Sequence, residues 1–456
     1  MKKYLNLFDF SQKVNYRTEI LSGLTVAFAL VPEAIAFALI PGFSPLTGLY
    51  AAFVIALITS ILGGRPGMIS GATGAVAVIF VGLILELKDN FPGITPETIL
   101  HYVFATVIIA GLLQITAGVL KLGKFIRLVP HPVMFGFVNG LAIIIFMAQF
   151  PNFYEKGTTD LLSGPAFWTM LGLTVLTMVI IWGFPKITKA IPSSLLAIIV
   201  VSAIVLGFGI DTRTVADTIA VGESIKGGFP PLSIPNIPLS LETFKIIFPY
   251  AAIVAGVGLI ESLLTLNIID EITDTRGSGN KECIAQGTAN IFSGFLSGMG
   301  GCAMIGQSLI NTSAGARARL SGITAAIMLL VFIMFGSSLI ERLPMAALVG
   351  LMFMVAIGTF EWASFKTFKK MPTSDVVVMV LVTLITAVTH NLAIAVLFGV
   401  IISALAYSWE NAKRIRARKT VDENGVKTYE IYGPLFFGST TAFAEKFDII
   451  NDPSDV

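Results

Sequence analysis

The sequence predicts an all-α polytopic membrane protein. Of its 456 residues, 55% are hydrophobic and only 13% are charged, whereas soluble domains carry about 25% charged residues. Apolar runs suited to a bilayer recur from residue 19 to residue 408, with polar loops between them. Glycine-rich interruptions fall at similar places in the two halves of the chain. These observations predict one membrane domain over residues 1–410.

Fourteen apolar runs fit transmembrane segments, of which the third, ninth and tenth are short or broken by glycine. They span residues 19–40, 45–63, 70–86, 98–120, 131–150, 166–184, 191–209, 246–268, 282–297, 301–314, 320–340, 343–360, 374–389 and 391–408. With the N-terminus inside, the inner loops carry thirteen Lys and Arg residues and the outer loops six. This bias predicts a multi-pass protein of the cell (inner) membrane with both termini in the cytoplasm.

Two repeats are predicted, over residues 19–209 and 246–408. In each repeat a broken segment follows the start of the first span by about 50 residues, at residue 70 and at residue 298. Seven spans in each repeat invert the second one, because an odd number of crossings reverses its direction. The proline-rich stretch 210–245 is the expected link between the repeats.

The stretch 280–311 holds the more pronounced interruption, with four glycines and Cys302 between residues 297 and 308. Glycine lowers helix propensity, and non-helical backbone at membrane depth requires cover by protein or a watery cavity. We therefore expect residues 301–308 to begin a half-helix whose N-terminus faces an anion. The matching segment of the first half is SGATGAVAV at residues 70–78. The alternative for both is a glycine-rich face for helix packing.

Two carboxyl groups are predicted inside the membrane. Glu33 follows Pro32 in the first span, and Glu261 lies one helical turn before Thr265 in the eighth. Ionisable residues at this depth are functional candidates, although a hydrogen-bonded structural carboxyl or a packing pair are alternatives. Glu261, Thr265 and peptide carbonyls from Gly300 to Cys302 together offer the oxygen ligands that Na⁺ prefers. A lone carboxyl would serve H⁺ as well.

The tail after Trp409 has a different composition. A basic run, ENAKRIRARK, fits an anchor at the anionic inner leaflet. It precedes a predicted strand, a turn at residues 433–434, a second strand and the start of a helix. Residues 411–456 are too few to bury a core of their own, so we expect the beginning of a truncated cytoplasmic domain.

Several function classes are excluded by the sequence. Cys283 and Cys302 form no CxxC pair, the three histidines are scattered, and no nucleotide loop or nucleophile elbow is present. An enzyme, a cofactor and a nucleic-acid partner are therefore not expected. The expected partners are a small anion, a coupling cation, Na⁺ or H⁺, and the lipid bilayer.

Over essentially the whole chain, the sequence resembles the SulP family of anion permeases, the sulfate permease family that includes the prestin relatives. The specific segments are PEAIAFALIPGFSPLTGLYAAF, LKLGKFIRLVPHPVMFGFVNG and GNKECIAQGTANIFSGFLSGMGG. The tail YEIYGPLFFGST is similar to the opening strands of the family's C-terminal STAS domain. The resemblance implies a bacterial-type member with 7+7 inverted repeats, core and gate domains, and a homodimer.

The resemblance also implies an anion site between the third and tenth half-helices. The residues in matching positions are Glu33, Phe37, Thr73, Gly74, Gly306, Gln307 and Ser308. Animal relatives commonly have glutamine in place of Glu33 and arginine in place of Gln307, so this site lacks a fixed positive charge. Sodium-dependent bicarbonate members carry an acidic residue and a threonine resembling Glu261 and Thr265, and proton-coupled bacterial members a carboxylate resembling Glu33.

We therefore expect a secondary active transporter of a small anion, either bicarbonate, sulfate or a dicarboxylate, driven by cation symport through an elevator-like movement. One alternative is a nucleobase permease of the same architecture. Others are an uncoupled anion channel or exchanger and a regulatory membrane scaffold. The anion, the coupling ion and the choice between symport and exchange stay open at the level of sequence.

Overall fold

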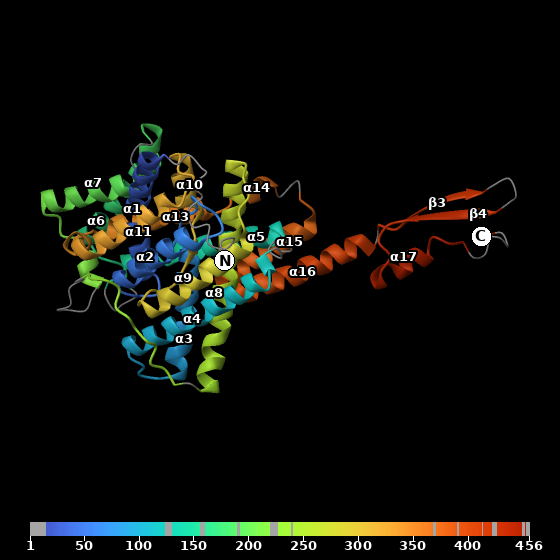
Figure 1. Ribbon diagram of the computed structural model, residues 1–456, viewed down its shortest axis with the longest axis horizontal. Coiled ribbons are helices and arrows are strands. Elements are labelled where there is room, and N and C mark those ends of the chain that lie inside the picture. Colours follow the sequence, from blue (N-terminus) through green and yellow to red (C-terminus); the bar gives the residue numbers. More distant parts are fainter. Residues whose placement is uncertain are drawn as a thin grey trace.

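The computed structural model describes residues 15–123, 130–155, 160–188, 192–218, 227–238, 240–367, 371–389, 392–412, 414–421, 426–448 and 452. Helices make up most of the described chain, and each of the fourteen predicted runs contains at least one helix (Figure 1). Parts of the predicted basic loops, at residues 124–129, 189–191 and 368–370, lie outside the described residues.

The helices of the first repeat are α1 to α7. Their bounds are Tyr16–Leu39, Pro45–Leu62, Gly74–Asn90, Pro96–Val119, His131–Met147, Pro165–Gly183 and Ser193–Phe208. Proline stands in the first turn of α2, α4, α5 and α6, where its missing N–H costs no hydrogen bond. Asn15 caps α1 and Thr95 caps α4, because their side-chain oxygens accept the N–H groups of Thr18 and Thr98.

The second repeat follows the same plan with two short additional helices. Its members α8 to α16 span Leu241–Thr273, Gly279–Phe295, Ile305–Ser313, Leu320–Phe335, Ser337–Glu341, Met345–Thr359, Ala363–Thr367, Thr373–Thr389 and Leu392–Ala412. The eighth predicted span is longer than expected, since α8 extends beyond residues 246–268 at both ends. The eleventh is divided at Gly336 into α11 and α12.

The third and tenth segments are broken as predicted. Each begins as a short strand and becomes a helix only afterwards. Strand β1, Ser70–Gly71, pairs antiparallel with strand β2, Cys302–Ala303. Helix α3 then begins at Gly74, and α10 begins at Ile305 rather than at residue 301. The two equivalent segments therefore cross in opposite directions at one point, as an inverted repeat requires.

The packing of the helices follows the same twofold relation. Helices α1 and α2 of the first repeat each pack on α11 of the second. Conversely, α8 and α9 of the second repeat each pack on α4 of the first. Likewise α5 packs on α15, and α13 packs on α6. Each contact thus recurs with the repeats exchanged, so the architecture of two inverted repeats is observed in the fold.

The helices divide into two groups that contact each other at few places. One group, here called the core, holds α1–α4 and α8–α11; the other, here called the gate, holds α5–α7, α13, α15 and α16. The described contacts between them include α1 with α7 and α13, α3 with α5, and α8 with α16. The strand pair β1–β2 lies inside the core.

The membrane-crossing character is supported by seven of the described helices. Those at Tyr16–Leu39, Pro45–Leu62, Pro96–Val119, His131–Phe153, Pro165–Lys186, Leu241–Thr273 and Met345–Lys366 are long and apolar enough to span a bilayer. Three further apolar helices are shorter. The half-helices α3 and α10 are also short, because a strand replaces the first part of each segment. The total of fourteen crossings stays a prediction.

The tail forms a β-hairpin that extends away from the helical body at the end of α16 (Figure 1). Strand β3, Arg416–Val421, pairs antiparallel with β4, Lys427–Tyr432. The basic run predicted as a membrane anchor therefore supplies the first strand. The prediction of a second strand after Pro434 is wrong, because that part forms a 3₁₀ turn, Phe437–Ser439, and the short helix α17, Thr440–Ala444.

Candidate functional site

The strand pair brings two helix N-termini together in the middle of the core. Gly71 pairs with Cys302, and α3 and α10 begin three residues beyond these positions. The first three N–H groups of each helix have no acceptor within the helix. These groups belong to residues 74–76 and 305–307. Two positive dipole ends therefore meet where an anion would gain from both.

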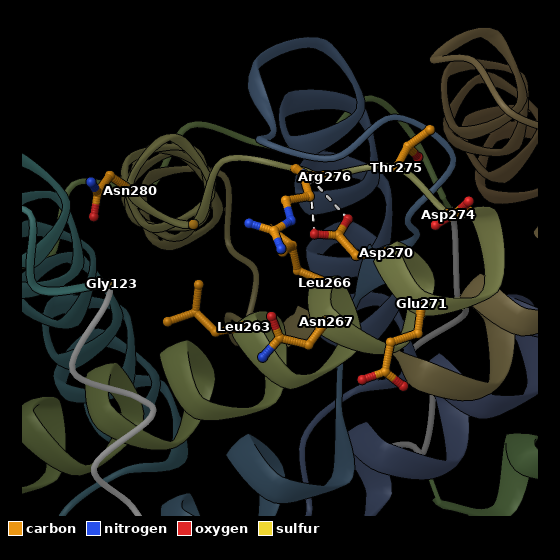
Figure 2. Close-up of a pocket in the computed structure, with 12 residues that line it drawn as sticks. Gly123, Leu263, Leu266, Asn267, Asp270, Glu271, Asp274, Thr275, Arg276 and Asn280 are labelled. Atoms are coloured by element: carbon orange, nitrogen blue, oxygen red, sulfur yellow. Dashed lines mark hydrogen bonds between the residues drawn. The ribbon is translucent and has the colours of Figure 1, made fainter.

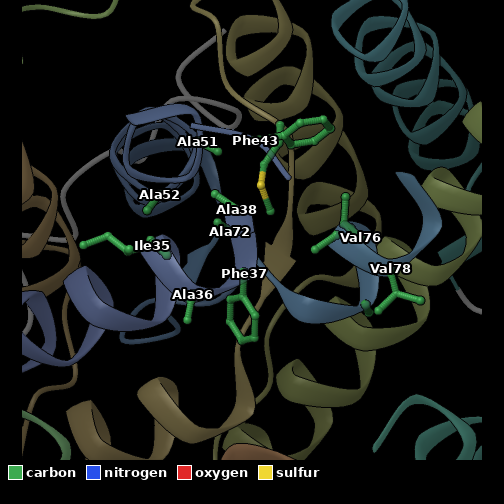
Figure 3. Packing of buried hydrophobic residues seen from close by; sticks show 14 of the residues in the cluster. Ile35, Ala36, Phe37, Ala38, Phe43, Ala51, Ala52, Ala72, Val76 and Val78 are labelled. Atoms are coloured by element: carbon green, nitrogen blue, oxygen red, sulfur yellow. The ribbon is translucent and has the colours of Figure 1, made fainter. Parts of the chain in front are cut away.

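Side chains from α1 lie beside both half-helix starts. Phe37 is 4% exposed and its ring lies against Gly74, where an added Cβ would come within 2.9 Å of its Cε1 atom. Figure 3 shows Phe37 on α1 near the start of α3, with Val76 in the same apolar cluster. One turn earlier on α1, the Glu33 carboxylate accepts a hydrogen bond from the amide of Gln307 on α10. A Cβ at Gly306 would meet no atom within 4 Å.

Ser308, predicted as an anion ligand, is hydrogen-bonded within the protein. Its N–H donates to the Met304 carbonyl at 3.0 Å, and its hydroxyl donates to the Ile69 carbonyl at 3.2 Å. The same oxygen accepts the Ile69 N–H at 2.9 Å. An anion needs donors, and both donors of Ser308 are used inside the protein. Ser308 therefore ties α10 to the residue before β1, and its contact with the anion stays a prediction.

The predicted coupling residues form a hydrogen-bonded chain that reaches the start of α3. The Cys302 thiol donates to Oε2 of Glu261, with 2.7 Å between sulfur and oxygen. The sulfur also lies 3.2 Å from Oγ1 of Thr73, the N-cap residue of α3. Thr73 and Cys302 are almost completely buried. Thr73, predicted as an anion ligand, thus also contacts Cys302, which is one of the predicted coupling residues.

Thr265 and Gly300 form hydrogen bonds with groups other than the Glu261 carboxylate. The Thr265 hydroxyl donates to the backbone carbonyl of Glu261 at 2.8 Å, so its lone pairs stay available to a cation. Gly300 has a φ of 76°, which favours glycine, and its N–H donates to Ser293 at 3.2 Å. Cys302 offers a thiol donor here, and sulfur is a poor ligand for a hard cation.

A row of buried polar residues on α9 holds the non-helical backbone and was missed in the sequence. Asn290 accepts the N–H of Gly301 at 2.9 Å and donates to the carbonyl of the same residue at 3.1 Å. Gln286 donates to the Ser70 hydroxyl at 2.7 Å and to Glu282 at 3.0 Å. All three α9 side chains are fully buried. Their spacing of four residues, which places all three on one face of α9, is a signal that the sequence contains.

A separate pocket of about 640 Å³ lies at the C-terminal end of α8 (Figure 2). None of the predicted anion or coupling residues lines it. Asp270 at its wall accepts the Gly277 N–H through both carboxylate oxygens and forms an ion pair of 3.1 Å with Arg65. Burial lowers the pKa of Arg65, and the adjacent Asp270 carboxylate opposes that shift. The pair ties the loop after α2 to the end of α8.

Known relatives match nearly the whole chain. YbaR of Bacillus subtilis (strain 168), whose name assigns it provisionally to sulfate transport, is 44% identical over 433 residues, which cover 95% of this chain and 85% of YbaR. The bicarbonate transporter BicA of Picosynechococcus sp. (strain ATCC 27264 / PCC 7002 / PR-6) is 30% identical over 473 residues, covering 96% of this chain and 82% of BicA.

Solved structures have the same architecture. The transmembrane domain of a cyanobacterial bicarbonate transporter BicA superposes with a TM-score of 0.72 at 27% identity, covering 86% of this chain and 98% of that domain. The structure of SLC26A9 gives a TM-score of 0.79 at 17% identity, covering 98% of this chain and 77% of SLC26A9, and this likeness concerns the fold alone.

The family model that describes the sulfate permease family matches residues 16–382. That range includes the strand pair, both half-helices and both carboxylates. Relatives and family are membrane transporters of anions and not enzymes. The chain therefore belongs to the sulfate permease family.

Proposed function

We propose that this protein is a secondary active transporter that carries a small anion together with Na⁺. The observation that carries the proposal is the meeting of two half-helix N-termini at the β1–β2 pair, with the Glu261 carboxylate linked to it through Cys302. Backbone N–H groups would hold the anion. The carboxylate beside them would hold the cation.

Bicarbonate and sulfate are the anions that the relatives favour, and a dicarboxylate is a further candidate. Both inorganic anions are small and rich in acceptor oxygens, which suits a site built from N–H donors. No basic side chain is found among the predicted anion residues. A cation that neutralises Glu261 would therefore lower the electrostatic cost of bringing an anion close to this carboxylate.

Sodium is the preferred coupling ion in this proposal. The Glu261 carboxylate, the lone pairs of the Thr265 hydroxyl and peptide carbonyls near residue 300 are hard oxygen ligands. The few contacts between core and gate support an elevator-like movement, in which the core carries the site past the gate. The homodimer and the inner-membrane location stay predictions.

Uptake into proteoliposomes tests the proposal. Labelled sulfate, bicarbonate and succinate are offered to the purified full chain with an inward Na⁺ gradient, with a K⁺ gradient as control, and at two pH values. We expect one of these anions to accumulate above equilibrium only with the Na⁺ gradient.

Other outcomes would identify the alternatives. Accumulation driven by a pH gradient alone would replace Na⁺ by H⁺. Equilibration without accumulation under any gradient would indicate an uncoupled channel or exchanger. Competition by uracil but not by the inorganic anions would indicate a nucleobase permease.

A further inference from the structure

The partly buried Glu261 and two buried side chains connect the proposed cation site to the proposed anion site. The sequence of contacts is Glu261 Oε2 to Cys302 Sγ at 2.7 Å, and Cys302 Sγ to Thr73 Oγ1 at 3.2 Å. Glu261 lies on α8, Cys302 on β2, and Thr73 at the start of α3. Cys302 is 0% exposed and Thr73 is 5% exposed. In such an environment the direction of each hydrogen bond matters energetically, because water cannot replace a lost partner.

The hydrogens in this chain can be assigned from the chemistry of the groups. A thiol and a hydroxyl each carry one hydrogen. The Cys302 hydrogen is donated to Glu261, so the bond between Thr73 and the sulfur must use the hydrogen of Thr73. Thr73 also makes no capping bond to its own helix. Its hydroxyl is therefore turned toward the sulfur, and its hydrogen is withheld from the space in front of α3.

We propose that Cys302 is a positioning residue that transmits cation occupancy at Glu261 to Thr73. The inference rests on the proposed sodium symport. Sodium on the carboxylate weakens the bond from the thiol, because the oxygen's negative charge is then shared with the cation. The S–H hydrogen turns to Oγ1 of Thr73, and the Thr73 hydrogen becomes free to donate to the anion. Both hydrogens are conserved and no covalent bond changes.

The surroundings of Cys302 hold its backbone while leaving this rotation possible. Cys302 pairs with Gly71 across the strand pair. The residues on either side are clamped, since Asn290 bonds both backbone groups of Gly301 and Ser262 accepts the Ala303 N–H at 3.1 Å. The sulfur therefore keeps its position between Thr73 and Glu261. Only the hydrogen needs to move for the signal to pass.

The test is the effect of Na⁺ on anion affinity, measured by calorimetry on the purified full chain. Sulfate and bicarbonate are both titrated, with Na⁺ or with K⁺ at fixed pH and ionic strength. We expect Na⁺ to lower the wild-type Kd about tenfold, within the range of about 5–150-fold found for coupled sites. In Cys302→Ala the ratio of the two Kd values should fall at least severalfold toward one, because nothing reports the cation to Thr73 and only the direct electrostatic effect of Na⁺ on Glu261 is left.

Further variants separate this role from a structural one. Cys302→Ser keeps one donor and one acceptor and should restore the dependence on Na⁺. Thr73→Val, which removes the hydroxyl at similar volume, should lose it. Cys283→Ala is the matched control, because Cys283 is an equally buried cysteine on α9 outside the chain of contacts. It should behave as wild type.

The outcomes distinguish the relay from the symport on which it rests. An unchanged sodium ratio in Cys302→Ala overturns the relay alone. A wild-type Kd that ignores Na⁺ overturns the proposed sodium symport and the relay together. If Cys302→Ala fails to fold, loss of the ratio in Thr73→Val with a restored ratio in Cys302→Ser supports the same conclusion, and an unchanged ratio in Thr73→Val contradicts it.

Discussion

The two membrane carboxylates have different chemical neighbours, and this difference suggests different roles. Glu33 accepts a hydrogen bond from Gln307 on α10, which lies in the first turn of the half-helix. Glu261 accepts a hydrogen bond from a thiol and has the Thr265 hydroxyl one turn away. We therefore propose that Glu33 adjusts the anion site and that Glu261 holds the cation.

Substitution by glutamine should separate these roles. Glu261→Gln removes the charge that would attract Na⁺, so sodium-driven uptake should fall to the background of empty vesicles. Glu33→Gln keeps the shape and a hydrogen-bond acceptor for Gln307, so anion Kd should change by less than about tenfold, or about 1.4 kcal/mol. Uptake by both variants is measured with and without a sodium gradient, across pH.

The opposite pattern would reverse the assignment. If Glu261→Gln still concentrates the anion and Glu33→Gln does not, Glu33 is the coupling residue and the driving ion is H⁺. The glutamine variants keep the side-chain volume, so a loss in either one reports the charge rather than packing.

Candidate residues could be recognised in the sequence where placing them in the membrane costs free energy. Carboxyl groups inside apolar runs stand out because burying them is expensive, and this singled out Glu33 and Glu261. The bonds of the Ser308 hydroxyl to Ile69 could not be predicted, because the position of Ser308 in the motif does not show where its hydroxyl points. The polar row Glu282, Gln286 and Asn290 was missed because the sequence does not show what these side chains contact. The partners include the Gly64 N–H, the Ser70 hydroxyl and the backbone of Gly301.

At the scale of elements, the two strands decide where the half-helices begin. Residues 70–71 and 302–303 are too short to show an alternating pattern, so the sequence indicated only that the helix is interrupted there. The helices themselves were predictable from length and apolar character. The tail strand β3 was not, because its basic residues suggested an anchor at the lipid surface.

Glycine substitutions should distinguish the strand pair from the helix start that follows it. A Cβ at Gly301 would lie 2.0 Å from the Gly71 carbonyl oxygen, whereas a Cβ at Gly306 meets nothing within 4 Å. We expect Gly301→Ala to lose about 1–3 kcal/mol of stability, as overpacking does. Gly306→Ala should unfold at the wild-type temperature or above. Thermal unfolding in detergent measures both.

A bulkier residue at the second position then tests the anion site itself. Gly306→Leu should keep the fold and abolish anion binding, because it fills the open space before α10. Gly74, the matching glycine of α3, is a poorer probe, since a Cβ there would lie 2.9 Å from the Phe37 ring. Unchanged anion affinity in a stable Gly306→Leu protein would contradict the placement of the site.

At the scale of the whole molecule, the transport machinery and the tail are separate parts. The twofold arrangement of α1–α16 contains the strand pair and both carboxylates. The hairpin continues from α16 and lies away from the helical body (Figure 1). The repeats could be predicted because broken segments recur at matching distances, but which helix packs on which depends on contacts between the two repeats.

Removal of the tail should leave transport nearly unchanged. The deletion is best made after Ala412, because a cut after Lys419 would divide β3 and leave an unpaired strand. We expect the shortened protein to insert normally and to take up the anion at nearly the rate of the full chain, because the strand pair and both carboxylates lie within α1–α16. A large loss of uptake by properly inserted protein would show that the tail takes part in transport.

The meeting of two helix N-termini at the strand pair has a consequence for how such proteins diversify. In the proposed function, the attraction for the anion comes from peptide N–H groups at the two helix N-termini, and every sequence with this fold has such groups. A single side-chain substitution would leave these donors in place. The preference for a cargo with hydrogen-bond acceptors would then be inherited with the fold, while the side chains around the site, such as Phe37, Thr73 and Gln307, would select among such cargoes.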